Sequence, residues 1–189
     1  MSHLKHLDDH SDLAALVYRG REDPDCVLRD FSRTLIAQGR HVVGLVQART
    51  GCQISASLLP TGETIMLSQA LGRHSQACAF DTSRLAQAAI HVQNGIVAGS
   101  DLVVINRFGK LEAQGKGLLD ELALAVAADT PVVIPVPQHR FEDWLRFSGG
   151  MGVKLACSAS SLHKWWSAVW GDGERRSPAY PPTYCEGIK

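Results

Sequence analysis

The chain has 189 residues, of which 45% are hydrophobic and 20% are charged, a balance typical of one soluble globular domain and far from that of a disordered chain. Nineteen Lys and Arg residues balance nineteen Asp and Glu residues, so we expect neither a nucleic acid nor a membrane as a partner. The chain starts with a polar stretch instead of a signal-peptide core, and no run of about 20 apolar residues follows, which predicts a cytoplasmic protein.

The first half of the chain alternates apolar and polar stretches in a strand, loop and helix order. Val27, Leu28, Phe31, Leu35 and Ile36 recur at helical spacing after the opening strand. The short apolar pieces CQISASLL and TIMLSQ flank the turn signal PTGE and predict a β-hairpin. The expected elements are a strand at 13–18, a helix at 24–38, a strand at 41–47, a hairpin at 52–69, a polar loop and a helix at 83–97.

The second half continues the alternation with apolar runs of the kind that fill strands buried on both faces. Such an order of strands and helices is typical of an α/β fold with a mainly parallel sheet. We expect one domain at 13–170, with flexible tails at 1–12 and 171–189. The expected elements are strands at 101–105, 131–136 and 152–158, and helices at 120–128, 139–147 and from Ser160 or Ser161 to 170.

Ligands of parallel α/β sheets bind beyond the carboxyl ends of the strands, so the loops there deserve the closest reading. The loop RGREDPD, residues 19–25, stands where a phosphate-binding loop would stand, but it lacks the glycines and the GK[ST] ending of that motif. Arg19 and Arg21 could still hold an anion beside the helix N-terminus. Alternatively, the acidic residues of the loop cap that helix and leave no room for an anion.

A second loop, NRFGKLE, follows the strand at 101–105. By residue chemistry alone, Gly109 could serve a turn while Lys110 and Glu112 form a surface ion pair of little energetic value. A functional interpretation has the charged side chains project into the crevice at the sheet edge.

The stretch DLVVI-NR-FGKLE, residues 101–112, resembles the Walker B region of the cancer-related nucleoside triphosphatases, a family of small P-loop enzymes first described from thermophiles. In that family an acidic pair follows the apolar strand, and I-G-K-M-E comes next. The chain is still more similar to a bacterial domain family of unknown function that is grouped with the P-loop nucleoside triphosphatases. Members of that family carry GLVQ, a GC or AC before an aromatic or Leu and Asp, and N-K-F-G-K-x-E, which residues 44–47, 78–81 and 106–112 nearly match.

This resemblance, which covers residues 13–150, implies a three-layer, Rossmann-like α/β fold of the P-loop nucleoside-triphosphatase type, with a mainly parallel sheet and a β-hairpin insertion. The departures from the pattern shape the functional prediction. Asn106 and Arg107 stand where the hydrolases carry their acidic pair, and RGREDPD replaces the P-loop. Phosphoryl transfer without the Mg²⁺-organising carboxylate and the P-loop lysine loses most of its electrostatic stabilisation.

We therefore predict a protein with degenerate Walker motifs that binds a nucleotide or another small oxyanion as a binding or regulatory module. Positive charge would come from Arg19, Arg21 and Lys110, while Asn106 would donate hydrogen bonds and Glu112 would orient Lys110. Members of the similar family are associated with molybdenum uptake, which makes molybdate a candidate ligand. The predicted ligand-binding set is Arg19, Gly20, Arg21, Asn106, Arg107, Lys110 and Glu112.

Two alternatives remain open at this point. The protein could be an active nucleoside triphosphatase with a non-standard site, in which Glu112 or Asp23 supports Mg²⁺. It could also bind a metal through Cys52 and Cys78, the latter close to a helix N-terminus that favours a thiolate. The five cysteines are widely spread and include no CxxC pair, so we expect reduced thiols.

The last helix carries Trp165, Trp166 and Trp170. Neighbouring residues in a helix point about 100° apart, so the three rings cannot all face one side. We expect one face of the helix to join the core, and the remaining ring to cover the crevice or a partner. A homo-oligomer formed through this helix is the corresponding hypothesis.

Overall fold

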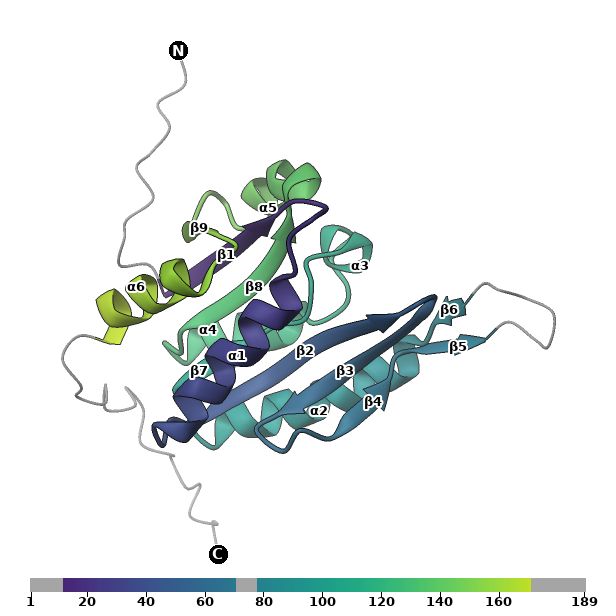
Figure 1. The fold of residues 1–189 in the computed structure, drawn as a ribbon, viewed down its shortest axis with the longest axis horizontal. Coiled ribbons are helices and arrows are strands. Elements are labelled where there is room, and N and C mark those ends of the chain that lie inside the picture. Colours follow the sequence, from purple (N-terminus) through teal and green to yellow (C-terminus); the bar gives the residue numbers. More distant parts are fainter. Residues whose placement is uncertain (1–11, 71–77, 171–189) are drawn as a thin grey trace, which may run out of the picture.

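The computed structural model describes residues 12–70 and 78–170 and places them in one α/β unit (Figure 1). The predicted tails at 1–12 and 171–189 lie almost wholly outside the described residues. The elements in chain order are β1 (Leu13–Tyr18), α1 (Pro24–Ala37), β2 (Val42–Thr50), β3 (Gln53–Leu59), β4 (Thr64–Met66), β5 (Ser68–Ala70), β6 (Cys78–Phe80), α2 (Thr82–Val97), β7 (Leu102–Val104), α3 (Lys110–Ala113), α4 (Leu119–Ala127), β8 (Val132–Pro137), the 3-10 turn η1 (Gln138–Arg140), α5 (Phe141–Phe147), β9 (Val153–Ala156) and α6 (Ala159–Trp170).

Seven strands form the main sheet in the order β4-β3-β2-β7-β8-β1-β9. The strands from β2 to β9 in this order run parallel, and β3 and β4 add two antiparallel strands at one edge. The β3–β4 pair is the predicted hairpin, and its turn follows a cis Leu59–Pro60 bond. The three-layer, mainly parallel architecture with a hairpin addition is thus confirmed.

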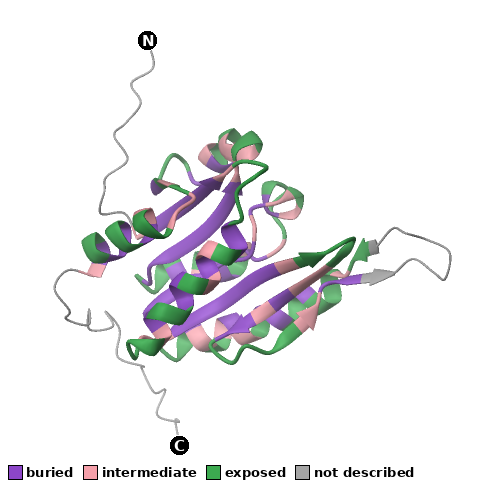
Figure 2. Cartoon of the chain, viewed as in Figure 1, coloured by how far each residue is buried: buried purple, intermediate pink, exposed green. Residues whose placement is uncertain are grey.

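The sheet lies between two helical layers with separate cores. Helices α1 and α6 cover one face, where Leu28, Phe31 and Leu35 of α1 pack at spacings of three and four residues. Helices α2 and α4 cover the other face together with Phe108 and Trp144. Figure 2 shows the central strands buried between these layers, with exposed residues on the outer helix faces. No helix in the described ranges is long and apolar enough to cross a membrane.

Gly44 permits the close approach of β2 and β7. Its φ of 136° suits glycine, and an added Cβ would lie 2.0 Å from the carbonyl oxygen of Val104. Gly44 is also the last residue of β2 paired with β7, while β2 continues to Thr50 paired only with β3. The second half of β2 and the first half of β3 therefore form an arm that extends beyond the end of β7 (Figure 1), and on its other side β3 pairs with β4.

Two sequence expectations for local structure are wrong. Ser68 and Gln69, expected at the end of the hairpin, belong to the separate strand β5, which pairs antiparallel with β6 at 78–80, a stretch expected within a polar loop. Backbone pairing needs no apolar run in so short a ladder. The helix expected from Ser160 or Ser161 begins at Ala159, and the hydroxyl of Ser158 accepts the Ser161 amide at its start.

The tryptophans of α6 serve the domain's own core. Trp165 and Trp166 are both buried, although they are neighbours in sequence, since the helix rests in the groove beside α1. Trp170 is half-buried and stacks on Trp166, with the guanidinium of Arg40 4.3 Å from its ring centroid. The homo-oligomer through this helix stays a prediction, and these contacts leave it little aromatic surface.

Candidate anion site at the carboxyl edge of the sheet

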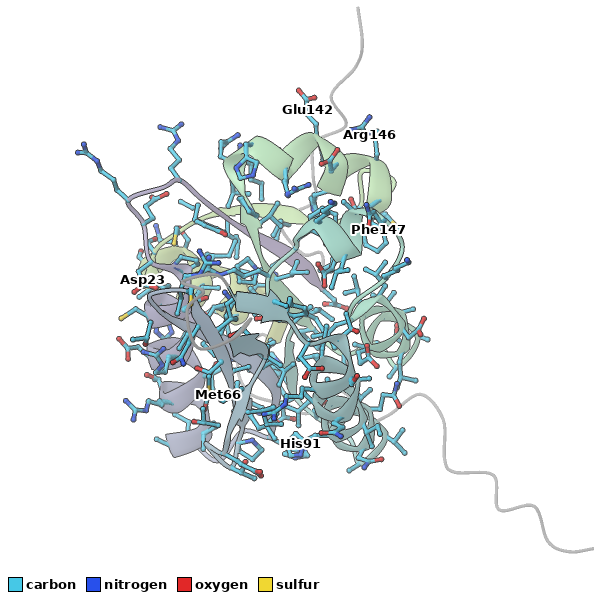
Figure 3. The ribbon with its side chains drawn as sticks, turned by 90° about the vertical axis from the view of Figure 1, so that its right-hand side faces the viewer. Asp23, Met66, His91, Glu142, Arg146 and Phe147 are labelled. Carbon is cyan, nitrogen blue, oxygen red and sulfur yellow. The ribbon has the colours of Figure 1, made fainter. Side chains whose placement is uncertain are left out.

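The parallel strands deliver several polar side chains to one edge of the sheet. Figure 3 looks at this edge, with Asp23 on the α1 side and Phe147 on the side of α3 and α5. The loop from β1 to α1 and the segment after β7 both end here, as the sequence predicts. The side chains that they carry make two separate groups, one at the start of α1 and one around α3.

The start of α1 is capped by its own acidic residues. The Asp23 carboxylate accepts hydrogen bonds from the amides of Asp25 and Cys26 at 3.1 and 3.0 Å, and Pro24 occupies the first helical turn, where its missing N–H costs nothing. The Glu22 carboxylate accepts from the Arg19 amide at 2.6 Å. These contacts agree with the interpretation in which the acidic residues of the loop cap the helix. The amides of Asp25 and Cys26 at the start of α1 already donate to the Asp23 carboxylate.

Arg107 lies at the centre of the first group. Its guanidinium donates to both oxygens of the Asp25 carboxylate, through Nε at 3.2 Å and through Nη2, and Nη1 donates to the Tyr18 hydroxyl at 3.2 Å. Asp25 is only 6% exposed. Burial raises the pKa of Asp25 above its ordinary value, and Arg107 opposes that shift. The pair fixes the guanidinium at the end of β7, pointing across to α1.

An open depression of about 490 Å³ lies beside this ion pair, between the start of α1 and the arm of β2. Arg29 and Arg49 line it, and neither forms an ion pair or a hydrogen bond among the described residues. The carboxylates that line it are all engaged, by backbone amides or by Arg107. The lining residues are Tyr18, Gly20, Glu22, Asp23, Asp25, Arg29, Ala48, Arg49 and Arg107.

Asn106 is buried next to Arg107, at 8% exposure. Its side-chain oxygen is fully enclosed and has no hydrogen-bond partner in the described part of the chain. Asn106 does not line the depression. Its predicted role as a donor to the ligand therefore stays a prediction without geometric support.

The second group, around α3, has a structural character. Glu112 is buried, and its Oε2 accepts the Gly109 amide at 2.9 Å, which caps the short helix α3. Burial raises the pKa of Glu112, while the amides of Glu112, Gly109 and Leu118 and the charge of Arg140 oppose the rise. Gly117 lies against this carboxylate: a Cβ added to Gly117 would lie 2.1 Å from Oε1 of Glu112. The φ of Gly117 is 75°, a conformation that also favours glycine.

The structure thus divides the residues that the sequence grouped together. Gly20 and Arg107 line the depression, and the exposed Arg19 and Arg21 flank Gly20 on the same loop. Lys110 is exposed on α3, does not line the depression and forms no ion pair with Glu112. Glu112 faces backbone amides and so does not orient Lys110 in this structure.

Sequence reasoning missed Arg29, Arg49, Tyr18 and Asp25. Arg29 lies one helical turn beyond Asp25 on α1, and this four-residue spacing is a sequence signal that could have identified it. Arg49 lies on a strand continuation whose path is set by β3, so no local pattern indicates that it faces α1. The pairing of Arg107 with Asp25 spans 82 residues and follows from strand order alone.

The cysteines differ from the expectation of reduced thiols at one position. Cys52, in the turn at the tip of the arm, is disulfide-bonded. Cys26 and Cys157 are free. The side chain of Cys78 lies outside the description, and in the described ranges no group of three His, Cys, Asp or Glu side chains is placed to hold a metal. A disulfide-bonded Cys52 has no thiolate to offer a metal, so the Cys52 and Cys78 metal site requires reduction of that bond and stays a prediction.

The architecture resembles the fold of the small P-loop nucleoside triphosphatases. The solution structure of a human cancer-related nucleoside triphosphatase matches with a TM-score of 0.55 over 82% of this chain and 93% of that one, at 13% identity. The crystal structure of THEP1 from the hyperthermophile Aquifex aeolicus matches with a TM-score of 0.50 over 86% and 99% of the two chains, at 11% identity. Likeness at such identities shows the fold.

The chain itself belongs to the family described as "Protein of unknown function (DUF2478)", whose model matches residues 13–165. The molybdenum import ATP-binding protein ModC 2 of Bradyrhizobium diazoefficiens is a relative with 41% identity over 164 residues. The match covers 84% of this chain and 18% of that protein, so the chain corresponds to less than a fifth of its relative.

Proposed function

We propose that this protein is a binding module for a small oxyanion or a phosphate-bearing nucleotide, and that it does not hydrolyse its ligand. One observation carries the proposal: Arg29 and Arg49 present unpaired guanidinium groups to a depression at the carboxyl edge of the sheet. This edge is where α/β folds bind ligands, and guanidinium groups suit oxyanions because they donate two parallel hydrogen bonds.

The loss of hydrolysis belongs to the same proposal. The loop at 19–25 has no GK[ST] ending, and Asn106 and Arg107 follow β7 in place of an acidic pair. The carboxylates named for an active enzyme have other contacts: Asp23 caps α1, and Glu112 accepts backbone amides. We therefore favour degenerate Walker motifs over a non-standard hydrolase.

The name of the relative supports molybdate as one candidate ligand and ATP as another. A regulatory or accessory role beside a molybdenum importer is the corresponding biological proposal, with a cytoplasmic location and no nucleic acid partner. The disulfide at Cys52 is the feature least expected in the cytoplasm.

Thermal denaturation of the purified protein with sodium phosphate, sodium molybdate, AMP and Mg-ATP tests the proposal. A ligand at a hundred times its Kd stabilises a protein by about 2.7 kcal/mol, which raises the Tm of a domain of this size by about 5–10 °C. The Arg49→Ala variant should lose this shift. Arg33→Ala is the matched control, because Arg33 is an exposed arginine of α1 outside the depression.

Two outcomes would contradict the proposal. Absence of a thermal shift with every anion would contradict anion binding. Turnover of ATP that Glu112→Gln abolishes would instead support the alternative that the protein is an active nucleoside triphosphatase. Lys110→Ala separately tests the sequence prediction that Lys110 binds the ligand. Loss of the thermal shift in this variant would support that prediction.

A further inference from the structure

We propose that the depression takes a phosphomonoester on an organic body of nucleotide size, as in a nucleoside monophosphate, in preference to a triphosphate or a bare tetrahedral oxyanion. This inference rests on the proposed function and names the ligand class of the same site. Charge, volume and the shape of the wall each lead to it.

The charges of the wall limit the charge of the ligand. Three carboxylates and three guanidinium groups line the depression, so the formal charge of the lining is zero. A phosphomonoester carries about two negative charges at neutral pH, since its second pKa is about 6, and two guanidinium groups are unpaired. A nucleoside triphosphate would bring further negative charge close to Glu22, Asp23 and Asp25. Charge matching therefore favours the monoester.

The volume of the depression separates a monoester from a bare anion. A tetrahedral oxyanion fills about two or three times the 30 Å³ share of a liquid water molecule. The depression measures about 490 Å³, within the roughly 300–1,000 Å³ range of pockets for organic ligands. A bare anion held by Arg29 and Arg49 would leave most of this space to water.

The shape of the wall gives the organic body a place. Gly20 lines the depression, and an added Cβ there would meet no atom within 4 Å. Ala48 contributes a short side chain on the arm of β2, and Tyr18 contributes an aromatic ring that is half-buried. The part of the wall around Gly20 is thus open and free of bulk, next to the charges that would hold the phosphate.

Gly20 also supplies the decisive variant. It is not in the left-handed region of backbone conformation, so leucine fits the backbone without strain. Its side chain would occupy part of the space that we assign to the organic body. Gly20→Ala is the matched control for the change of backbone freedom. Arg49→Ala tests the phosphate end of the site.

Isothermal titration at fixed salt would compare AMP, GMP, metal-free ATP in the presence of EDTA, sodium phosphate and sodium molybdate on the full chain. We expect at least one monophosphate to bind more tightly than every other probe. Gly20→Leu and Arg49→Ala should each weaken that binding at least tenfold, and Gly20→Ala should weaken it less than Gly20→Leu does. Arg33→Ala, outside the depression, should leave it unchanged. Circular dichroism melting of each variant verifies the fold.

The other outcomes overturn the inference in distinguishable ways. Tighter binding of metal-free ATP than of either monophosphate refutes the charge argument and leaves the proposed function standing. Binding of molybdate or phosphate that survives Gly20→Leu, without binding of a monophosphate, refutes the volume argument and again leaves the proposed function. No binding of any probe overturns both.

Discussion

Replacement of Arg107 by alanine should destabilise the protein strongly at neutral pH, because it leaves the Asp25 carboxylate buried without its counter-ion. Asp25 is 6% exposed and receives two hydrogen bonds from Arg107. Removal of one partner from a fully buried ion pair costs about 3–5 kcal/mol. The Arg107 side chain is 30% exposed, which allows water to reach the remaining carboxylate, so we expect a loss of about 2–3 kcal/mol.

The loss should depend on pH with a defined sign. Burial already raises the pKa of Asp25 in the parent protein, so the folded state holds the Asp25 proton to higher pH than the unfolded state does. Stability from this group therefore falls as pH rises from the ordinary aspartate pKa to the raised one. Without Arg107 the pKa rises further, and the variant should approach the stability of its parent at about pH 4, where Asp25 takes up a proton.

Urea denaturation at pH 7 and pH 4 measures both effects. The double variant Asp25→Asn, Arg107→Ala should recover more than half of the loss at pH 7, because it leaves no buried charge. Arg33→Ala controls for the loss of a surface arginine. Every variant retains the buried Glu112, so the contribution of Glu112 to the pH dependence of stability cancels in the comparison. A cost below 0.5 kcal/mol for Arg107→Ala at pH 7, or an equal cost at both pH values, would refute the reasoning.

Three further predictions concern other parts of the molecule. Gly44→Ala should cost more than about 3 kcal/mol in urea denaturation, since a Cβ would lie 2.0 Å from the Val104 carbonyl oxygen; near-parent stability would contradict the packing of β2 on β7. Burial raises the pKa of Cys157 to about 11, so iodoacetamide at pH 8 should label the exposed Cys26 at least tenfold faster in peptide mass mapping, and equal rates would contradict this. Glu112→Ala should destabilise more than Glu112→Gln by about 1 kcal/mol, because glutamine keeps an acceptor for the Gly109 amide; equal melting temperatures would refute the capping role.

The sequence predicts the architecture well because strong local signals determine most elements. The apolar runs at β1 and β8 and the helical spacing in α1 leave little choice of structure. The hairpin of β3 and β4 follows from its turn residues. Strand β6 has no such signal and was not predicted, and Ser68 and Gln69 of β5 were assigned to the second strand of the hairpin.

The candidate site was less predictable because its members meet through the order of strands. Sequence adjacency grouped Lys110 with Arg107, yet Arg107 turns towards α1 and Asp25. Glu112 has a charge that suggests a surface or a ligand, and it caps a buried turn instead. A pattern of residues shows which side chains reach the sheet edge, and only the fold shows which of them face the same space.

The arm of β2 and β3 contributes a wall of the depression whose residues can change with little effect on the rest of the sheet. Its wall at Ala48 and Arg49 belongs to a stretch of β2 that pairs only with β3. If the depression binds a ligand as proposed, exchange of residues there would alter ligand preference while the seven-stranded framework keeps its own contacts. Relatives built on this framework can therefore diverge in what they recognise through a handful of changes on one ribbon, with little penalty for folding.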